Sequence, residues 1–375
     1  MGSGRLDCVN ESRVNLRPAV DALPTYVPGA RIPVGAAAYK VSSNENPYPP
    51  LPSVVAAIAD AASDINRYPD MGNTDISDAL AAYLTDRASE QALEKGPIAP
   101  ENLVFGTGSV AVLAHILHTV VNPGDEVVYP WRSFEAYPIV VSVAGGTSVQ
   151  VPLGAGDRLD LDAMVDAITD RTKVIMVCTP NNPTGPAVTH TETMAFLARV
   201  PKNILVVLDE AYLEFVQMDD ALDALAALAQ YPNVIVLRTF SKAYGLAGLR
   251  VGYAVARPRI AAGVRAVATP FGVSLVAQHA VLASLRASDE LHERVDHIIA
   301  ERARLIAGLQ SQGWKVADSQ ANFVWLNLGD RTAAIAEQCT AKGLLVRPFG
   351  NEGIRVSVGE PEATDLFLEL AATWQ

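Results

Sequence analysis

Cysteine is scarce in this chain, basic clusters are missing, and no apolar run is long enough to cross a bilayer. The three cysteines among 375 residues, Cys8, Cys178 and Cys339, have the spacing of neither a disulfide framework nor a metal site. A net charge of −12 without a basic cluster argues against a nucleic-acid partner. We therefore expect no membrane, nucleic-acid or metal partner, and the unpaired thiols fit a reducing cytoplasm.

Internal repeats and low-complexity tracts are missing as well. Half of the residues are hydrophobic and only 19% are charged, a balance that excludes a disordered chain. A length of 375 residues is enough for two domains with a sizeable core. Function therefore has to be inferred from local motifs and not from overall composition.

Strand-like and helical runs alternate from Val54 to about Ala256, which predicts an α/β fold with a mostly parallel sheet sandwiched by helices. The expected strands lie at 102–105, 126–129, 148–152, 174–178, 204–208, 234–238 and 251–255. After Pro270 the pattern changes to a long helix near 288–312, short strands, and a final helix from about Pro361. The short strands are expected at 314–317, 323–327, 344–346 and 354–358. This part predicts a second, smaller α+β domain.

Polar side chains follow three of the expected strands. Asp209 ends the apolar run from Ile204, and a sharp turn at 179–185, which holds Asn182 against a proline, follows the run at 174–178. Such strands are buried on both faces of a parallel sheet, and their carboxyl ends meet at the crevice where ligands bind. Taken alone, Asp209 is equally a helix cap and the turn equally a crossover loop, so these motifs gain meaning only in combination.

The third strand end carries an amine. Lys242 follows the apolar run 234–237, with hydroxyl groups at Thr239 and Ser241 and a guanidinium at Arg250. An amine beside hydroxyl groups and a cation suits a covalent aldehyde cofactor whose phosphate needs an anchor. Pyridoxal 5′-phosphate (PLP) is such a cofactor, because its aldehyde forms a Schiff base with lysine and its pyridine nitrogen needs a nearby carboxylate to stay protonated.

A glycine-rich turn offers a second anchor for a phosphate. Residues 104–109 read Val-Phe-Gly-Thr-Gly-Ser and join a short strand to a helix at 109–121. Glycines at such a turn let the backbone approach an anion, and the helix N-terminus provides N–H groups without partners. His115 and His118 share a face of this helix, but neither a Cys nor an acidic residue flanks them, so we expect no metal there.

In this order, the motifs resemble the signature of fold-type I PLP-dependent aminotransferases. The motifs behind the resemblance are Asn-Pro-Thr-Gly (182–185), Asp-Glu-Ala-Tyr (209–212) and the run at 238–250 that contains Ser-Lys. Similarity to the histidinol-phosphate aminotransferase branch comes from the last of these and from 43–47, 66–70 and 353–359. Similarity to the actinobacterial aromatic amino acid aminotransferases comes from 131–138 and 319–326.

The resemblance implies a role around PLP for each matching residue. Lys242 is expected to form the Schiff base and to shuttle a proton between the substrate's α-carbon and the cofactor's C4′. Asp209 is expected to pair with the pyridinium nitrogen. Asn182 and Tyr212 are expected to bond the phenolic oxygen, and Phe134 to stack on the ring. The catalytic residues implied by the resemblance are thus Lys242, Asp209 and Tyr212.

The resemblance also implies a phosphate site, a substrate site and a subunit arrangement. The phosphate is expected between two groups of residues, Thr107, Gly108 and Ser109 on one side and Thr239, Ser241 and Arg250 on the other. Tyr68 is expected to reach the phosphate of a neighbouring subunit, which implies a homodimer with shared sites. The substrate's α-carboxylate is expected at Arg355, whose guanidinium matches it at two points. Other candidates for the substrate pocket are Asn182, Tyr26, Tyr48, Phe271, Arg347 and Phe349. A large PLP-binding domain is expected at 43–267, and a small domain from 1–42 plus 268–375.

Aromatic amino acids, with 2-oxoglutarate as amino acceptor in a ping-pong sequence, are the expected substrates. Phe271 stands where we associate tyrosine with the histidinol-phosphate enzymes, and it makes that wall of the pocket more apolar. Histidinol phosphate is the alternative substrate, because Arg355 and Arg347 can serve its phosphate. A PLP lyase or decarboxylase and a non-catalytic protein of the same fold are further alternatives, and amino-group transfer to an oxo acid separates the enzyme from both.

Overall fold

A seven-stranded sheet forms the centre of the larger part of the chain in a computed structural model, which describes residues 15–23 and 38–374. The strand order is β2-β8-β7-β6-β5-β3-β4; β8 is antiparallel to both neighbours, and the other pairs are parallel. The strands are β2 (Leu103–Gly106), β3 (Glu126–Trp131), β4 (Thr147–Pro152), β5 (Thr172–Cys178), β6 (Leu205–Asp209), β7 (Val234–Thr239) and β8 (Gly252–Ala256). They match the seven runs expected from the sequence, so the predicted α/β fold is confirmed.

Apolar residues on both sides of every strand except β4 explain why helices cover both faces of this sheet. Along β6, Leu205 and Val207 join the core on one face, whereas Val206 and Leu208 join the core on the other. The first face is covered by α5 (Ser109–Val120), α6 (Ala136–Ala144) and α10 (Pro258–Ala266). The second is covered by α2 (Pro52–Ala61), α3 (Thr74–Asp86), α4 (Glu90–Leu93), α7 (Leu161–Asp166), α8 (His190–Arg199), α9 (Ala224–Gln230) and α11 (Leu275–Arg286).

Local sequence sets where several of these helices begin. The hydroxyl of Thr189 accepts a hydrogen bond from the amide of Glu192, and the carboxylate of Glu192 accepts one from the amide of Thr189, so the pair caps α8. Pro52 and Pro258 begin α2 and α10, where a proline lacks only an N–H that has no partner in the helix. Ser274 caps α11 with its side chain.

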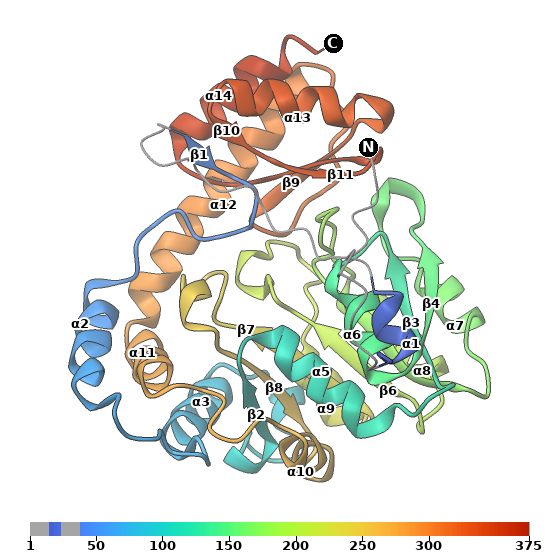
Figure 1. Cartoon of the computed structure of the whole chain (residues 1–375), viewed down its shortest axis with the longest axis vertical. Helices are drawn as coiled ribbons and strands as arrows, with labels where there is room; N and C mark the ends of the chain where they lie inside the picture. Colours follow the sequence, from blue (N-terminus) through green and yellow to red (C-terminus); the bar gives the residue numbers. More distant parts are fainter. Residues whose placement is uncertain (1–14, 24–37, 375) are drawn as a thin grey trace.

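The smaller part of the chain lies at the top of Figure 1 and has its own sheets. One is antiparallel with the order β11-β12-β9, and a parallel pair joins β1 to β10. The strands are β1 (Tyr39–Lys40), β9 (Phe323–Asn327), β10 (Leu344–Leu345), β11 (Arg347–Phe349) and β12 (Gly353–Ser357). The helices are α12 (Ser288–Ser311), α13 (Thr332–Ala341) and α14 (Pro361–Ala371). Helix α12 connects the two parts, because Leu291 and Val295 belong to the core of the larger part and Leu305 and Leu309 to that of the smaller part.

The strand expected at 314–317 is wrong, since these residues form no strand. The indole Nε1 of Trp314 donates to the carbonyl oxygen of Ala371 at 3.3 Å, and its ring lies edge-on to Trp374 with centres 6.3 Å apart. Trp314 therefore packs at the end of α14, and Trp314 and Val316 both pack against the core of the smaller part. The apolar residues of this segment have the spacing of a strand but are half-buried without any strand pairing.

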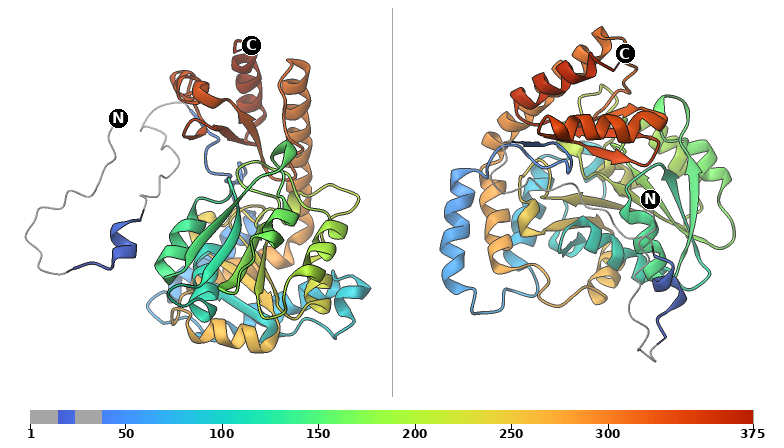
Figure 2. Two further views of the ribbon diagram at one scale, coloured as in Figure 1. Left: turned by 90° about the vertical axis from the view of Figure 1, so that its right-hand side faces the viewer. Right: turned by 45° about the horizontal axis from the view of Figure 1, so that its top comes forward.

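The expected domain division, with the larger domain at 43–267, stays a prediction. Helix α11 follows residue 267 and packs against α2 and α3 in the core of the larger part. At the other end of the described chain, α1 (Pro18–Asp21) lies at the side of the larger part, where Arg17 donates to the carbonyl oxygen of Val143 just inside α6 (Figure 2). Within the described residues, no helix combines the length and the apolar character that crossing a membrane requires.

Candidate active site

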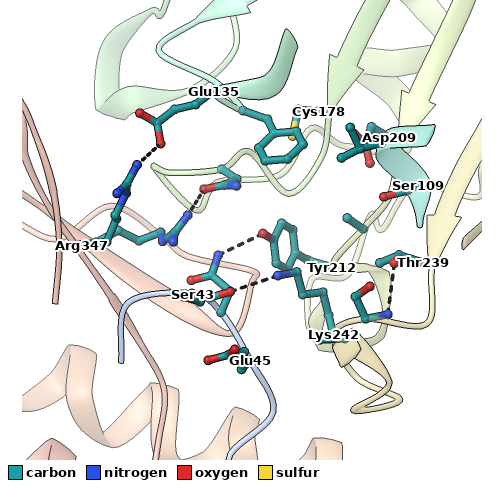
Figure 3. A pocket seen from close by; sticks show the side chains of 18 of the residues that line it. Ser43, Glu45, Ser109, Glu135, Cys178, Asp209, Tyr212, Thr239, Lys242 and Arg347 are labelled. Atoms are coloured by element: carbon teal, nitrogen blue, oxygen red, sulfur yellow. Dashed lines mark hydrogen bonds and ion pairs between the residues drawn. The ribbon is translucent and has the colours of Figure 1, made fainter. Parts of the chain in front are cut away.

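The polar strand ends meet at one edge of the large sheet, where a cavity of about 270 Å³ opens (Figure 3). Strands β5, β6 and β7 are parallel neighbours and end at Cys178, Asp209 and Thr239, so their carboxyl ends lie side by side. Strand β2 points the same way, because two antiparallel pairings through β8 separate it from β7. Twelve residues expected at the site line this cavity: Ser109, Phe134, Asn182, Asp209, Tyr212, Thr239, Ser241, Lys242, Arg250, Arg347, Phe349 and Arg355.

Lys242 presents its amine to the cavity beside Tyr212 (Figure 3). Its Nζ donates to the carbonyl oxygen of Ser43 at 3.1 Å and lies 5.8 Å from the centre of the Tyr212 ring. Burial, followed by the nearby positive charges of Arg355 and Arg250, lowers the pKa of Lys242 from 10.5 to about 7. A large fraction of the amine is therefore unprotonated near neutral pH, as a nucleophile or general base must be.

Asp209 is a buried carboxylate, 5% exposed, at the end of β6. Its Oδ2 accepts a hydrogen bond from the hydroxyl of Tyr137 at 2.8 Å, whereas its Oδ1 has no hydrogen-bond partner among the described residues. Burial raises the pKa of Asp209 from 3.8 to about 6, although the hydroxyl of Tyr137 and the amide of Ala211 act in the opposite direction. A buried acceptor without a partner is unfavourable, so Oδ1 is suited to a ligand atom that carries a proton.

Tyr212 is held by a hydrogen bond from a loop that precedes the large sheet in the chain. The Nδ2 of Asn44 donates to the Tyr212 hydroxyl oxygen at 2.9 Å. Burial raises the pKa of Tyr212 above its usual value, so the phenol stays protonated and its own proton is available for a ligand. Phe134 also lines the cavity, and its ring packs edge-on against Tyr137 with centres 5.6 Å apart.

Arg355, on β12 of the smaller part, reaches Asn182 of the larger part and the segment that follows β1. Its Nη1 donates to Oδ1 of Asn182 at 2.5 Å, and its Nη2 donates to the carbonyl oxygen of Ser42 at 2.7 Å. Its guanidinium carbon also lies 5.5 Å from the ring centres of Phe323 and Phe349. These contacts fix the plane of the guanidinium, which is the requirement for binding a carboxylate at two points.

Arg347, on β11, is the cross-strand neighbour of Arg355. Its Nη2 donates to Oε2 of Glu135 at 2.7 Å, an ion pair between the smaller part and the segment just before α6 (Figure 3). The side chain of Arg347 is 8% exposed and that of Glu135 is 31% exposed. The guanidinium carbon of Arg347 lies 5.4 Å from the centre of the Phe349 ring. Two guanidinium groups thus border the cavity side by side.

Hydroxyl groups and a further guanidinium gather around the turn from β2 to α5. Ser109 begins α5, the Nη1 of Arg250 lies 3.4 Å from Oγ of Ser241, and the Oγ1 of Thr239 accepts from the Ser241 amide at 3.1 Å. Only glycine suits position 108, because its φ is +88° and a Cβ there would lie 2.4 Å from Nη2 of Arg250. A helix N-terminus, hydroxyl groups and a cation at one point suit a phosphate.

The residues of this cavity fit PLP in three respects. Lys242 provides an amine with a lowered pKa, Asp209 provides a buried oxygen without a partner, and the turn at Gly108 leaves a cradle that a larger side chain would fill. Lys242, Asp209 and Arg250 line one cavity, and the side chain of Arg250 also lies against Gly108. The role of each residue toward the cofactor stays a prediction.

The described residues that line the cavity do not include Thr107, Tyr68, Phe271 and Tyr48, which were expected at the site. The ring centre of Tyr48 lies 5.9 Å from the guanidinium carbon of Arg294 instead. Thr107 is exposed and lines a neighbouring cavity together with His115. Tyr68 is 81% exposed, and its ring stacks on that of Phe271 with centres 4.6 Å apart, outside the cavity of its own chain. Tyr26 lies outside the described residues. A role for Tyr68 or Phe271 at a site therefore requires a second copy of the chain.

Three polar side chains that hydrogen-bond to expected site residues received no role from the sequence. They are Asn44, which bonds Tyr212; Tyr137, which bonds Asp209; and Glu135, which pairs with Arg347. All three lie inside segments that carry the resemblance, 43–47 and 131–138, and the signal was thus present in the sequence. The partner of each residue could be identified only in the folded chain, because each pair is separated by 72 to 212 residues in the sequence.

Comparisons with known proteins cover nearly the whole chain. The family "Aminotransferase class I and II" matches residues 38–369. The aromatic amino acid aminotransferases of Streptomyces coelicolor and Streptomyces avermitilis are 53% and 52% identical to this chain, over 97% and 96% of it and 98% of each relative. The structure is similar to that of histidinol-phosphate aminotransferase from Sinorhizobium meliloti in complex with pyridoxal-5′-phosphate, with a TM-score of 0.82, 30% identity and 97% of each chain covered. It is also similar to N-succinyldiaminopimelate aminotransferase from Mycobacterium tuberculosis, with a TM-score of 0.78 and 25% identity over 89% of this chain and 92% of the other.

Proposed function

The chain belongs to the class I and II aminotransferases, and from this premise we propose that it transfers the amino group of phenylalanine, tyrosine or tryptophan to 2-oxoglutarate. As a member of this family it is a PLP-dependent enzyme. The observation that carries the choice of substrate is the similarity over nearly the full length to relatives named aromatic amino acid aminotransferases. The phenyl ring of Phe349 at the cavity supports that choice, since it offers an apolar contact to an aryl group.

Proton transfer in this reaction is assigned to Lys242. When bound, PLP supplies an electron sink that stabilises negative charge at the substrate's α-carbon. The Nζ of Lys242 takes the α-proton and later returns a proton, which a group with a pKa of about 7 can do in both directions near neutral pH. The hydrogen bond from Nζ to the carbonyl oxygen of Ser43 supports this role, because it orients the amine within the cavity.

The other polar residues are assigned to binding and orientation. Asp209 would hold the pyridinium nitrogen through its Oδ1, which lacks a partner among the described residues. Tyr212 and Asn182 would bind the phenolic oxygen, and Arg355 would bind the substrate's α-carboxylate. Because Asn182 also accepts a hydrogen bond from Arg355, cofactor and substrate would be oriented by one connected set of side chains.

One assay tests the substrate proposal. The purified protein, supplied with PLP, is given phenylalanine, tyrosine or histidinol phosphate, each with 2-oxoglutarate. We expect kcat/KM to be at least about tenfold higher with the aromatic amino acids. Histidinol phosphate is the second candidate, because an aminotransferase named for it shares the fold with a TM-score of 0.82. A preference for it would overturn the choice of substrate, and release of carbon dioxide from the donor would indicate a decarboxylase.

A homodimer with shared sites completes the proposal. Tyr68 and Phe271 form a stacked pair at the surface, and the nearby Ile65 and Met71 are 67% and 59% exposed. Exposed apolar side chains grouped in this way are typical of a surface that another protein covers. Tyr68 would then reach the phosphate cradle of the partner subunit. The division into domains at 43–267 and the cytoplasmic location stay predictions.

A further inference from the structure

Glu135 is a charged residue of the cavity to which the proposed mechanism gives no task. It follows Phe134 in the chain, lines the cavity, and pairs with Arg347 across the gap between the two parts at 2.7 Å (Figure 3). Arg347 in turn borders Arg355 on the neighbouring strand, in direct cross-strand register. The ion pair therefore stands next to the guanidinium to which the substrate's α-carboxylate is assigned.

The two substrates of the proposed reaction make different demands on this corner of the cavity. An aromatic amino acid carries one carboxylate and an uncharged ring, so one guanidinium, that of Arg355, is sufficient. 2-Oxoglutarate carries two carboxylates and needs a second cation for the distal one. Arg347 is suitably placed, since its guanidinium and that of Arg355 lie 5.4 and 5.5 Å from the same ring, Phe349.

Resting on the proposed function, we propose that Glu135 is a specificity-determining residue, a displaceable counter-ion of Arg347. It neutralises Arg347 while an aromatic ring occupies the cavity, and it gives way when the distal carboxylate of a dicarboxylic oxo acid arrives.

Burial explains why Arg347 needs a counter-ion from the protein when an aromatic substrate is bound, but not when the substrate itself brings a second carboxylate. Its side chain is only 8% exposed, and a buried guanidinium without an anion disfavours an apolar ring beside it. The side chain of Glu135 is 31% exposed, so its carboxylate has a path to water when it leaves the pair. In both complexes the guanidinium then has one carboxylate partner, from the protein or from the substrate.

A second ion pair between the same two segments provides a matched control. Arg132, three residues before Glu135, pairs with Glu352, which lies in the hairpin between β11 and β12. The Nε of Arg132 donates to Oε2 of Glu352 at 2.9 Å. Neither residue lines the cavity, although the guanidinium carbon of Arg132 lies 5.7 Å from the centre of the Phe349 ring, so this pair joins the two parts of the chain from outside the cavity.

The test compares the binding of two unreactive ligands to the PLP-loaded enzyme. Glutarate is the dicarboxylate and 3-phenylpropionate the aromatic monocarboxylate, and calorimetry gives a Kd for each. We expect Glu135→Gln to tighten glutarate and weaken 3-phenylpropionate, so that the ratio of the two Kd values changes by about tenfold. Glu352→Gln should leave the ratio unchanged, and Arg347→Met should weaken glutarate selectively. In turnover, Glu135→Gln should lower the KM for 2-oxoglutarate and raise that for phenylalanine.

Two results would overturn this role of Glu135. One is an equal change of both Kd values in Glu135→Gln, and the other is the same change of ratio in Glu352→Gln, which would indicate a general effect of joining the two parts. Glu135→Asp keeps the charge and should retain most of the wild-type preference, which separates charge from misfolding. A wild-type enzyme inactive on aromatic amino acids would refute the proposed substrates, but the ratio of the two Kd values would still test Glu135.

Discussion

Two titratable residues that line the same cavity have pKa values displaced in opposite directions. Burial lowers the pKa of Lys242 to about 7 and raises that of Asp209 to about 6. In the protein without cofactor, the stability linked to Lys242 is present above its ordinary pKa of 10.5 and is lost as the pH falls through about 7. The stability linked to Asp209 is present below 3.8 and is lost as the pH rises through about 6. The site therefore suits a ligand that donates a hydrogen bond to Asp209 and reacts with the amine of Lys242.

The rate at which the cofactor-free protein takes up PLP should depend on the protonation of Lys242. Because the unprotonated amine attacks the aldehyde, we expect the rate to rise with pH through about 7, well below the ordinary value of 10.5. Arg355→Met removes a positive charge that lowers the pKa of Lys242, so the midpoint should move to higher pH. Stopped-flow absorbance measures this rate. Arg347→Met is the control with a smaller expected shift, and a rate that rises only near pH 10.5 would contradict the lowered pKa.

Tyr137→Phe should weaken PLP binding in a pH-dependent manner. The Tyr137 hydroxyl donates to Asp209 and lowers its pKa, so without it the carboxyl group stays protonated to higher pH. A protonated carboxyl cannot stabilise a pyridinium ion, and a change of roughly one pKa unit corresponds to about tenfold in affinity. Equilibrium titration of PLP at several pH values is the measurement. The two proteins should converge at alkaline pH, where Asp209 is ionised in both; a constant difference at every pH would instead indicate a packing defect.

At the scale of secondary-structure elements, the site is built from the ends of parallel strands and one helix N-terminus. Strands β5, β6 and β7 carry their polar residues to one edge because they are adjacent and parallel. The turn between β2 and α5 brings a fourth set of groups to the same edge. Gly252, at the start of β8, also lies against this turn, since a Cβ there would come within 2.3 Å of the Ser109 amide nitrogen. Small residues thus set how closely Arg250 and the helix N-terminus approach each other.

Gly108→Ala should reduce PLP affinity much more than it reduces stability. A Cβ at position 108 would lie 2.4 Å from Nη2 of Arg250, and the residue has a φ of +88°. Gly124→Ala is a matched control, because its φ is +92° but nothing lies within 4 Å of a Cβ there. Both variants should lose about 1–3 kcal/mol of stability from backbone strain, measured by urea unfolding without PLP. Only Gly108→Ala should raise the Kd for PLP, by at least about tenfold; equal effects would argue against the cradle.

Long apolar strands and the motifs at their ends were predictable from sequence, whereas short or long-range features were not. Strand β6 is recognisable because its apolar run ends in the polar residue Asp209. Strands β5 and β7 are likewise apolar runs that are followed by polar motifs. Strands β1 and β11 have two and three residues and carry no usable pattern. The wrongly expected strand at 314–317 has a different cause. Apolar residues that alternate along a loop and pack against a core have the same sequence pattern as a strand. Pairs such as Glu135 and Arg347 depend on how the two parts of the chain meet, which no local pattern encodes.

At the scale of the whole molecule, the cavity needs both parts of the chain, and the proposed dimer would add a second copy. Arg347 and Arg355 come from the smaller part, and Lys242 and Asp209 from the larger. Two cross-contacts, from Arg347 to Glu135 and from Arg355 to Asn182, join the parts at the cavity. Relative movement of the two parts would therefore change the substrate site directly. Tyr68 is exposed in the single chain, and in the proposed dimer it would contribute to the site of the partner subunit.

Mixing two inactive or impaired variants tests whether subunits share their sites. In a hybrid of a Lys242→Ala chain with a Tyr68→Phe chain, one site receives Lys242 from its own chain and Tyr68 from the other, and is therefore complete. We expect co-refolded or co-expressed mixtures to exceed the summed activity of the two parent proteins, with up to about one intact site per hybrid dimer. Sedimentation should show a dimer in each case. Activity no greater than the sum of the parents would contradict the contribution of Tyr68 in trans.

The covalent attachment of the cofactor to Lys242 is the claim on which the whole account depends. Reduction of the PLP-loaded enzyme with borohydride, followed by proteolysis and mass spectrometry, fixes and locates that bond. We expect a single phosphopyridoxyl group on Lys242 and none in Lys242→Ala, which should still bind PLP but lose both turnover and the absorbance of the attached cofactor. A modified lysine elsewhere in the chain, or an unchanged absorbance spectrum in Lys242→Ala, would contradict the claim.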